Sequence, residues 1–218
     1  MINEVNLYDA ESHLPEIYDQ EETQTHDVKF IMKLLQNTDC RTILEPFCGT
    51  GRILLPLAEE GYEMVGIDSS AGMLKRLREK LHKLPQSIQD RVNIIQSDLR
   101  TSDWPKGFDA VLLAGNCLYE LAGATEQQQI IRKAAESLKP QGFLFVDNDN
   151  MEGELVDSWC HIDQEVESFP NGLCTDGTQL QGYTRPTWVD RKRRIWRTQR
   201  RLEVIYPNGT REEKRWHT

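Results

Sequence analysis

The alternation of short apolar runs with longer amphipathic stretches between residues 41 and 147 constrains the fold more than any other feature of this sequence. Short apolar runs predict buried strands, and apolar residues three and four positions apart predict helices. The predicted strands are residues 41–45, 64–67, 92–96, 110–114 and 143–147, and the predicted helices are residues 52–60, 71–83 and 126–138. Strands alternating with helices form a parallel sheet with helices on both faces, and right-handed crossovers bring the carboxyl ends of the strands to one edge. The sequence therefore predicts an α/β fold, a Rossmann-like three-layer αβα core with a mostly parallel central sheet.

The segments on either side of this core have a different character. Residues 1–22 are acidic and irregular, with Pro15 placed to interrupt a long helix, whereas residues 23–36 carry apolar side chains at helical spacing. Residues 151–177 show no strong period, and from about residue 182 the pattern is strand, turn, strand, turn, strand. We expect residues 1–150 to form the core with an N-terminal lid segment, and residues 151–218 to form a three-stranded antiparallel β addition that is not an independent domain.

Composition narrows the classes of function. The net charge is −9, and an acidic chain repels phosphate backbones, so a dedicated nucleic-acid binder is disfavoured. The five cysteines are an odd number without Cys-x-x-Cys spacing, which fits neither a disulfide framework nor a zinc site. No apolar stretch reaches the ~18 residues that span a membrane, and the N-terminus lacks the pattern of a signal peptide. We therefore expect a cytoplasmic protein with reduced thiols, no metal ion and no membrane contact.

The first chemical motif is a glycine turn after the first predicted strand, in the segment Ile43-Leu-Glu-Pro-Phe-Cys-Gly-Thr-Gly-Arg52. Glycines let the backbone approach a ligand closely, and a nucleotide pyrophosphate is the best-known ligand of such turns. Two features argue against a pyrophosphate. The third glycine of the dinucleotide fingerprint is replaced by Leu54, and Glu45 adds a negative charge beside the turn. Glu45 suits a ligand that carries an ammonium group.

Acidic residues also follow the next two predicted strands. Asp68 ends the second strand, where a carboxylate can accept hydrogen bonds from both hydroxyls of a ribose. Asp98 follows the third strand and can accept from an exocyclic amine such as that of adenine, while Leu99 can pack on the ring. The segment 115–120 lies just past the fourth strand, facing the middle of such a ligand.

Together these motifs resemble the class I S-adenosylmethionine-dependent methyltransferases, in particular the small-molecule branch with the sugar-amine and glycine N-methyltransferases. The resemblance implies that the loop with Glu45, Gly49 and Gly51 holds the methionine part of S-adenosylmethionine, that Asp68 holds the ribose and that Asp98 meets adenine. It also implies that Tyr18, in a Tyr-Asp pair, closes over the methyl group. The family has two further strands after the fifth, and the sequence offers no candidate for them.

The resemblance implies transfer of a methyl group to N or O of a small-molecule acceptor. The expected cofactor-binding residues are Tyr18, Glu45, Phe47, Gly49, Thr50, Gly51, Arg52, Asp68, Ser69, Met73, Asp98, Leu99 and Asn116. Tyr119, Asn148 and Asn150 are the expected contacts of the acceptor, the C-terminal addition is expected on the substrate side, and no catalytic base stands out. A homodimer through the sheet edge or the antiparallel addition is a further expectation.

Simpler interpretations stand beside these. Asp68 can serve as a helix cap, the polar cluster 147–150 as a solvated turn, and Tyr18 as a packing residue. Alternative functions also remain at this stage. They are an RNA or protein methyltransferase that uses the basic run 191–201, a truncated cofactor-binding module without activity, and a nicotinamide-dependent oxidoreductase.

Overall fold

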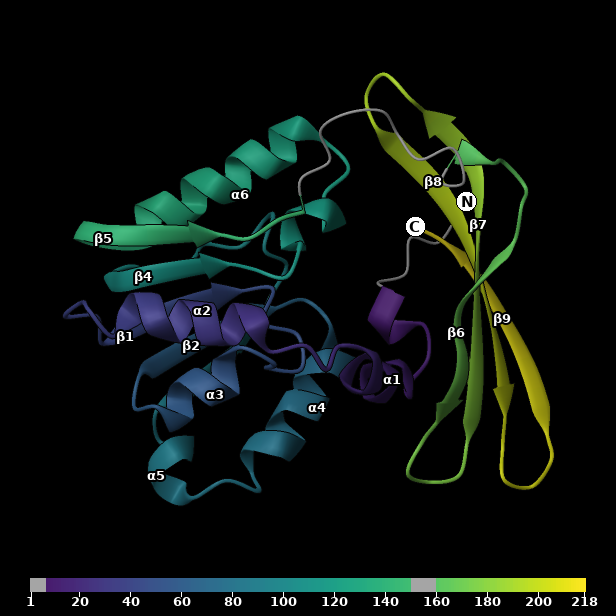
Figure 1. Ribbon diagram of the computed structural model, residues 1–218, viewed down its shortest axis with the longest axis horizontal. Helices are drawn as coiled ribbons and strands as arrows, with labels where there is room; N and C mark the ends of the chain where they lie inside the picture. Colours follow the sequence, from purple (N-terminus) through teal and green to yellow (C-terminus); the bar gives the residue numbers. More distant parts are fainter. Residues whose placement is uncertain (1–6, 150–159) are drawn as a thin grey trace. The chain divides into compact units, whose positions relative to one another are not determined.

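The computed structural model describes residues 7–149 and 160–218 and divides the chain into two compact units (Figure 1). Residues Thr23–Asp149 form one unit, and the described residues up to Glu22 and from Cys160 onward form the other. We refer to them as the parallel unit and the antiparallel unit, after the sheets that they contain. The sequence did not indicate that the N-terminal residues group with the C-terminal sheet.

The parallel unit is built on a five-stranded sheet in the order β3-β2-β1-β4-β5. All its strand pairs are parallel. The strands are β1 (Thr42–Pro46), β2 (Glu63–Asp68), β3 (Val92–Gln96), β4 (Phe108–Leu113) and β5 (Leu138–Val146). The helices are α2 (His26–Leu35), α3 (Leu54–Glu59), α4 (Ala71–Leu81), α5 (Gln86–Gln89) and α6 (Ala124–Ser137), with a 3₁₀ turn, η2, at Cys117–Glu120. The predicted Rossmann-like fold is confirmed. In this strand order β1 and β4 are neighbours, and their carboxyl ends lie at one edge of the sheet.

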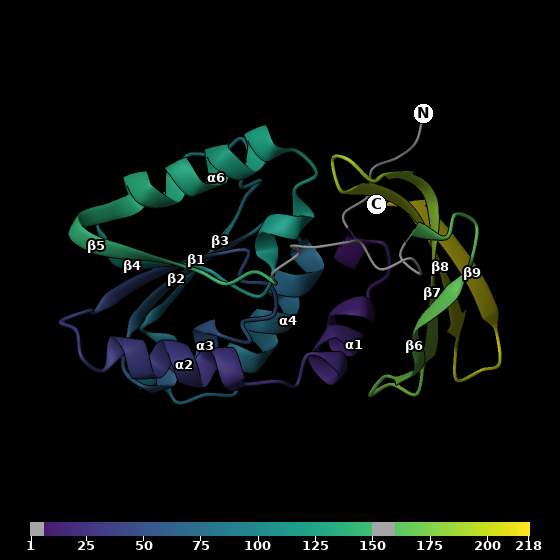
Figure 2. The same ribbon diagram turned by 45° about the horizontal axis from the view of Figure 1, so that its top comes forward.

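Alternating side chains of the strands build a core on each face of this sheet. Ile43 of β1 joins a buried cluster with α2, α3 and α4, whereas its neighbour Leu44 joins a cluster with α6. Figure 2 shows α6 on one face of the sheet and α2 and α3 on the other. Leu54 and Leu57 of α3 are fully buried, and each such leucine contributes about 1.5–3 kcal/mol of transfer free energy.

The edge strand β5 begins earlier than predicted. It starts at Leu138, directly after α6, and includes Pro140, where the sequence indicated a break. A proline is tolerated because β5 pairs with β4 alone, and the register shifts between Phe108 and Ala110. Among the described residues no further strand joins this sheet, which agrees with the missing last strands of the family.

The antiparallel unit contains a four-stranded sheet in the order β6-β7-β8-β9, where three strands were expected. The strands are β6 (Val166–Leu173), β7 (Gln179–Asp190), β8 (Ile195–Ile205) and β9 (Arg211–His217). The unpredicted strand is β6. Its register shifts twice, between Glu167 and Phe169 and between Phe169 and Gly172, which removes the alternation that marks a strand in sequence.

A helix that the sequence did not indicate packs on this sheet. After a 3₁₀ turn, η1 (Leu7–Asp9), α1 spans Leu14–Glu21, with Pro15 in its first turn, where a proline is compatible with a helix. Leu14 and Ile17 of α1 form a buried cluster with Leu180, Leu202 and Val204 of the sheet. Pro15 therefore begins a helix, and the prediction that residues 1–22 are irregular was wrong for α1. Among the described residues no helix has the length and apolarity needed to cross a membrane.

Candidate functional site

The turn between β1 and α3 has a backbone that ordinary side chains rarely adopt. Phe47, Gly49 and Gly51 have positive φ angles of 61°, 52° and 80°. A Cβ atom at Gly51 would lie 2.3 Å from Cδ1 of Leu77, so the turn passes against α4 where only glycine fits. The Cys48 amide donates to the Ile67 carbonyl at 3.2 Å, which fixes the turn across the end of β2. The glycine turn predicted from the sequence is thus held at the carboxyl edge of the sheet.

Glu45 lies at the end of β1 and is buried, with an exposed fraction of 5%. Its Oε2 atom is buried and has no hydrogen-bond partner. Burial raises the pKa of this carboxyl group to about 8, with Asp27 and Asp68 adding to the effect of burial and Arg52 opposing it. A buried carboxyl oxygen without a partner costs free energy, so a cationic hydrogen-bond donor would be stabilised here.

Arg52 connects the glycine turn to α2. Its Nη1 and Nη2 atoms donate to Oδ1 and Oδ2 of Asp27 at 2.9 and 2.6 Å, and Nη1 also donates to the Gln24 carbonyl at 3.0 Å. Burial opposes the charge of Asp27, but the hydrogen bonds from Arg52 and from the Val28 amide outweigh it and lower the pKa of Asp27. Nη2 would lie 3.3 Å from a Cβ at Gly115, so the guanidinium group also lies against the loop after β4.

Asp68 ends β2 and holds the loops on either side of it. Oδ2 accepts from the Gly49 amide at 2.9 Å, and Oδ1 accepts from the Ser70 amide at 2.9 Å. These bonds connect the glycine turn to the loop that precedes α4 through the Asp68 carboxylate. The helix cap is Ser70, whose Oγ accepts from the Met73 amide at 3.1 Å. Asp68 therefore shapes the site directly, and its predicted contact with ribose stays a prediction.

Three other predicted residues surround this point. Met73 is buried, and its Cε atom would lie 3.2 Å from a Cβ at Gly49, so it packs beneath the turn. Thr50 is fully buried within the turn, whereas Ser69 is exposed beside Asp68.

Asp98 is engaged with a neighbouring cation. Nε and Nη2 of Arg100 donate to its two oxygens, each at 3.1 Å, and these hydrogen bonds lower the pKa of Asp98. The exposed fractions of the two side chains are 40% and 53%, so this is a surface ion pair of about 0–1 kcal/mol that a ligand can displace. Leu99 is buried, and its carbonyl accepts from Trp104 Nε1 at 3.1 Å. The predicted adenine contacts of both residues stay predictions.

The loop after β4 closes onto the end of β5. Asn116 has a positive φ of 61°, and its side chain is bonded to Asp149 twice, to the carboxylate at 3.0 Å and to the amide at 2.6 Å. The Tyr119 hydroxyl donates to the Asp149 carbonyl. Oδ1 of Asn148 is buried without a hydrogen-bond partner. The structure thus brings Asn116, Tyr119 and Asn148 together, whereas Asn150 lies outside the described residues.

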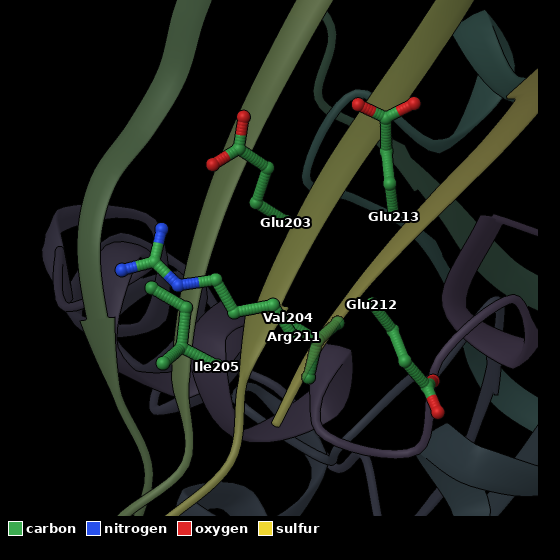
Figure 3. Close-up of a pocket in the computed structure, with 6 residues that line it drawn as sticks. All are labelled: Glu203, Val204, Ile205, Arg211, Glu212 and Glu213. Carbon is green, nitrogen blue, oxygen red and sulfur yellow. The ribbon is translucent and has the colours of Figure 1, made fainter. Parts of the chain in front are cut away.

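The remaining predicted features lie in the antiparallel unit. Tyr18 is on α1, where its ring packs edge-on against Tyr8 with centroids 5.7 Å apart. A hollow of about 200 Å³ lies on β8 and β9, lined by Glu203, Val204, Ile205, Arg211, Glu212 and Glu213 (Figure 3). None of the residues expected at the cofactor site lines this hollow.

Comparison with known families identifies the core. Residues 43–142 match the family described as a methyltransferase domain, and this range contains β2, β3, β4, the glycine turn and all of β1 except its first residue. The parallel unit therefore contains a methyltransferase domain. The family predicted from the motifs is therefore confirmed, and the matched range of this methyltransferase domain contains all its predicted cofactor residues except Tyr18.

A curated relative and two solved structures are similar to the chain beyond this range. Glycine N-methyltransferase from Oryctolagus cuniculus is 30% identical over 132 residues, which cover 56% of this chain and 45% of that enzyme. The amino pentose methyltransferase CalS10 from Micromonospora echinaspora, solved with S-adenosylmethionine bound, has a TM-score of 0.66 and 20% identity over 99% of this chain and 84% of its own. DesVI from Streptomyces venezuelae has a TM-score of 0.70 and 16% identity over 99% of this chain and 83% of its own.

These similarities differ in what they show. The chain matches less than half the length of the curated relative. The two structures are below 25% identity and show the fold alone.

One residue of the site was not indicated by the sequence. Asp27 stands on a helix far from the motifs, and nothing local marks it as a partner of Arg52. The pairing of Asn116 with Asp149 was also missed, although the Gly115-Asn116 step carried a turn signal.

Proposed function

We propose that this protein transfers the methyl group of S-adenosylmethionine to N or O of a small-molecule acceptor. The observation that carries the proposal is the buried, unpartnered oxygen of Glu45 beside a glycine turn at the carboxyl edge of the sheet. The chemistry of this donor set fits the cofactor, since Glu45 meets an ammonium group and Asp68 offers acceptors for ribose hydroxyls. The methyltransferase domain match supports the same cofactor.

The bound cofactor would supply a methyl group made electrophilic by its sulfonium, so the chain mainly has to orient an acceptor. Glu45, Gly49 and Gly51 would hold the methionine part, and Asp68 the ribose. Arg52, Phe47, Thr50, Ser69, Met73 and Asn116 would complete the contacts, with Asp98 and Leu99 at adenine. Alignment of the acceptor lone pair and exclusion of water contribute several kcal/mol to such transfers.

The acceptor is proposed to be a small molecule that sheds its proton to solvent. Tyr119 and Asn148 lie together on the loop side of the site, and Asn148 offers a buried oxygen for a donor group of the acceptor. The names of glycine N-methyltransferase and of the amino pentose methyltransferase support an amine as the methylated group.

A second copy of the chain is the proposed protein partner. The free edge of β5 and the antiparallel sheet are the surfaces that we propose for this contact. A cytoplasmic location stays an expectation from the sequence.

The nucleic-acid alternative loses support from the charges around the basic run. Residues 191–194 form an exposed turn, but Arg201 is paired with Glu165, Glu203 and Glu213. The positive charge available to a phosphate backbone is therefore smaller than the sequence suggested.

Calorimetric titration with S-adenosylmethionine, S-adenosylhomocysteine and NADH tests the proposal. We expect micromolar binding of the two sulfur nucleosides and no heat with NADH. A folded sample that binds neither nucleoside would refute the proposed cofactor, and binding of NADH alone would favour an oxidoreductase.

A further inference from the structure

We propose that Asp27 is a positioning residue of the cofactor site, which acts through Arg52 on Glu45 without touching the cofactor. This inference rests on the proposed function for its ligand, but its geometry belongs to the chain itself. Asp27 lies in the first turn of α2, outside every motif that marks the site.

Two carboxyl groups, those of Asp27 and Glu45, interact with the guanidinium group of Arg52. Arg52 is the cation that stabilises the charge of Glu45, yet its two terminal nitrogens donate to Asp27 at 2.9 and 2.6 Å. The Gln24 carbonyl accepts from Nη1 as well. Asp27 thus takes both terminal nitrogens, while Oε2 of Glu45 is buried without a hydrogen-bond partner.

A role in packing alone does not explain this arrangement. A direct ion pair between Arg52 and Glu45 would fill the position that an ammonium ligand needs. A bidentate pair between arginine and carboxylate is geometrically specific, and the side chains of Asp27 and Arg52 are only 18% and 16% exposed. Asp27 thus holds Arg52 near enough to help ionise Glu45 and keeps it from closing the site.

The groups that face Glu45 come from several elements. Arg52 follows the glycine turn, Asp27 is on α2 and Asp68 ends β2. The buried thiols of Cys48 and Cys117 also face it, and burial raises the pKa of both far above neutrality, so they stay uncharged. Of these groups, only Asp27 both pairs with Arg52 and disfavours the charge of Glu45.

A carbon-13 NMR titration of Glu45 in the free protein tests the inference without any ligand. We expect the midpoint of Glu45 to move to lower pH in Asp27→Asn, because the variant loses a negative charge and releases Arg52. The Glu45→Gln variant assigns the resonance, and Asp39→Asn, which changes an exposed carboxylate beyond the end of α2, should leave the midpoint unchanged. An unchanged midpoint in Asp27→Asn would overturn the inference.

Binding of S-adenosylmethionine gives the second readout. At pH 8, Asp27→Asn should bind about tenfold more weakly, since Arg52 now competes for Glu45. In the Arg52→Gln background the same change should alter affinity by less than twofold, because the effect through Arg52 is gone and only the direct effect of the Asp27 charge on Glu45 remains. Full additivity of the two changes would show that Asp27 acts independently of Arg52.

Asp27→Glu keeps the charge and covers the case in which Asp27→Asn does not fold. It should retain the Glu45 midpoint, and a midpoint as low as that expected for Asp27→Asn would contradict the proposed role of charge. A wild-type protein that binds no cofactor would refute the proposed function, whereas the NMR titration would still decide the role of Asp27.

Discussion

Replacing Gly51 by alanine tests whether the cofactor turn is shaped by its contact with α4. Gly51 has a φ of 80°, and an added Cβ would lie 2.3 Å from Cδ1 of Leu77, a side chain that is fully buried. The backbone conformation costs an alanine roughly 1–2 kcal/mol, and forcing a methyl group into a packed core costs about 1–3 kcal/mol. The expected loss in the free energy of unfolding is therefore about 2–5 kcal/mol.

Gly107→Ala is the matched control for this prediction. Gly107 belongs to the same unit and has a φ of 93°, but no heavy atom lies within 4 Å of the position of an added Cβ. It should lose only the backbone cost, about 1–2 kcal/mol. The difference of about 1–3 kcal/mol between the two variants isolates the contact with Leu77.

Urea unfolding monitored by circular dichroism measures both variants. With a slope of about 1–3 kcal/mol per molar urea, Gly51→Ala should lower the midpoint by about 1–2 M. Combining it with Leu77→Ala should cost less than the sum of the single changes, because the shortened side chain relieves the contact. Equal losses in Gly51→Ala and Gly107→Ala would refute the reasoning, since Leu77 would then move aside freely.

Three further predictions concern titratable groups. Because the pKa of Glu45 is about 8, its ionised fraction rises about tenfold between pH 6 and 7. The affinity for S-adenosylhomocysteine should therefore rise about tenfold in that interval. Calorimetric titrations of Glu45→Gln should not show this rise. Asp68→Ala leaves the Gly49 and Ser70 amides without their acceptor and should weaken cofactor binding by about 1–3 kcal/mol; wild-type affinity would remove Asp68 from the site. Burial opposes the charge of His13, but Asp176 and Glu11 outweigh it and raise its pKa, so the contribution of His13 to stability should be fully present below about pH 6.5 and be lost as pH rises through the raised value. Thermal unfolding of His13→Gln across this range should show a smaller fall, and a parallel pH profile would contradict the assignment.

The sequence predicted the strands of the parallel unit well because buried parallel strands are apolar throughout and end at turns. Val92–Gln96 was predicted with its observed bounds. Elements whose stability depends on distant contacts were not predicted. Register shifts remove the alternation of β6, and α1 is stabilised by a buried cluster with strands from the other end of the chain.

The residues of the candidate site also divide into those that local sequence patterns predict and those that depend on distant contacts. Glu45 and Asp68 could be predicted because strand ends in this fold converge, whereas the partner of Arg52 could not. Asp27 is a first-turn acid on α2, a position that is favourable at any helix N-terminus. Only the folded chain distinguishes a carboxylate that stabilises a helix from one that also controls a charge in the site.

The charge at Glu45 explains why a Gly-x-Gly turn can select a cation in place of a phosphate. The turn alone favours an anion, because backbone amides and the start of α3 carry partial positive charge. In the free protein Glu45 is mostly protonated near neutral pH, since burial raises its pKa to about 8. A pyrophosphate would raise this pKa further and could accept a hydrogen bond only from the protonated carboxyl group, whereas an ammonium group lowers the pKa and gains a charge-assisted hydrogen bond to the carboxylate. Under the proposed function, Glu45 would therefore favour a cationic ligand over an anionic one, and Asp27 would keep Arg52 from pairing with Glu45.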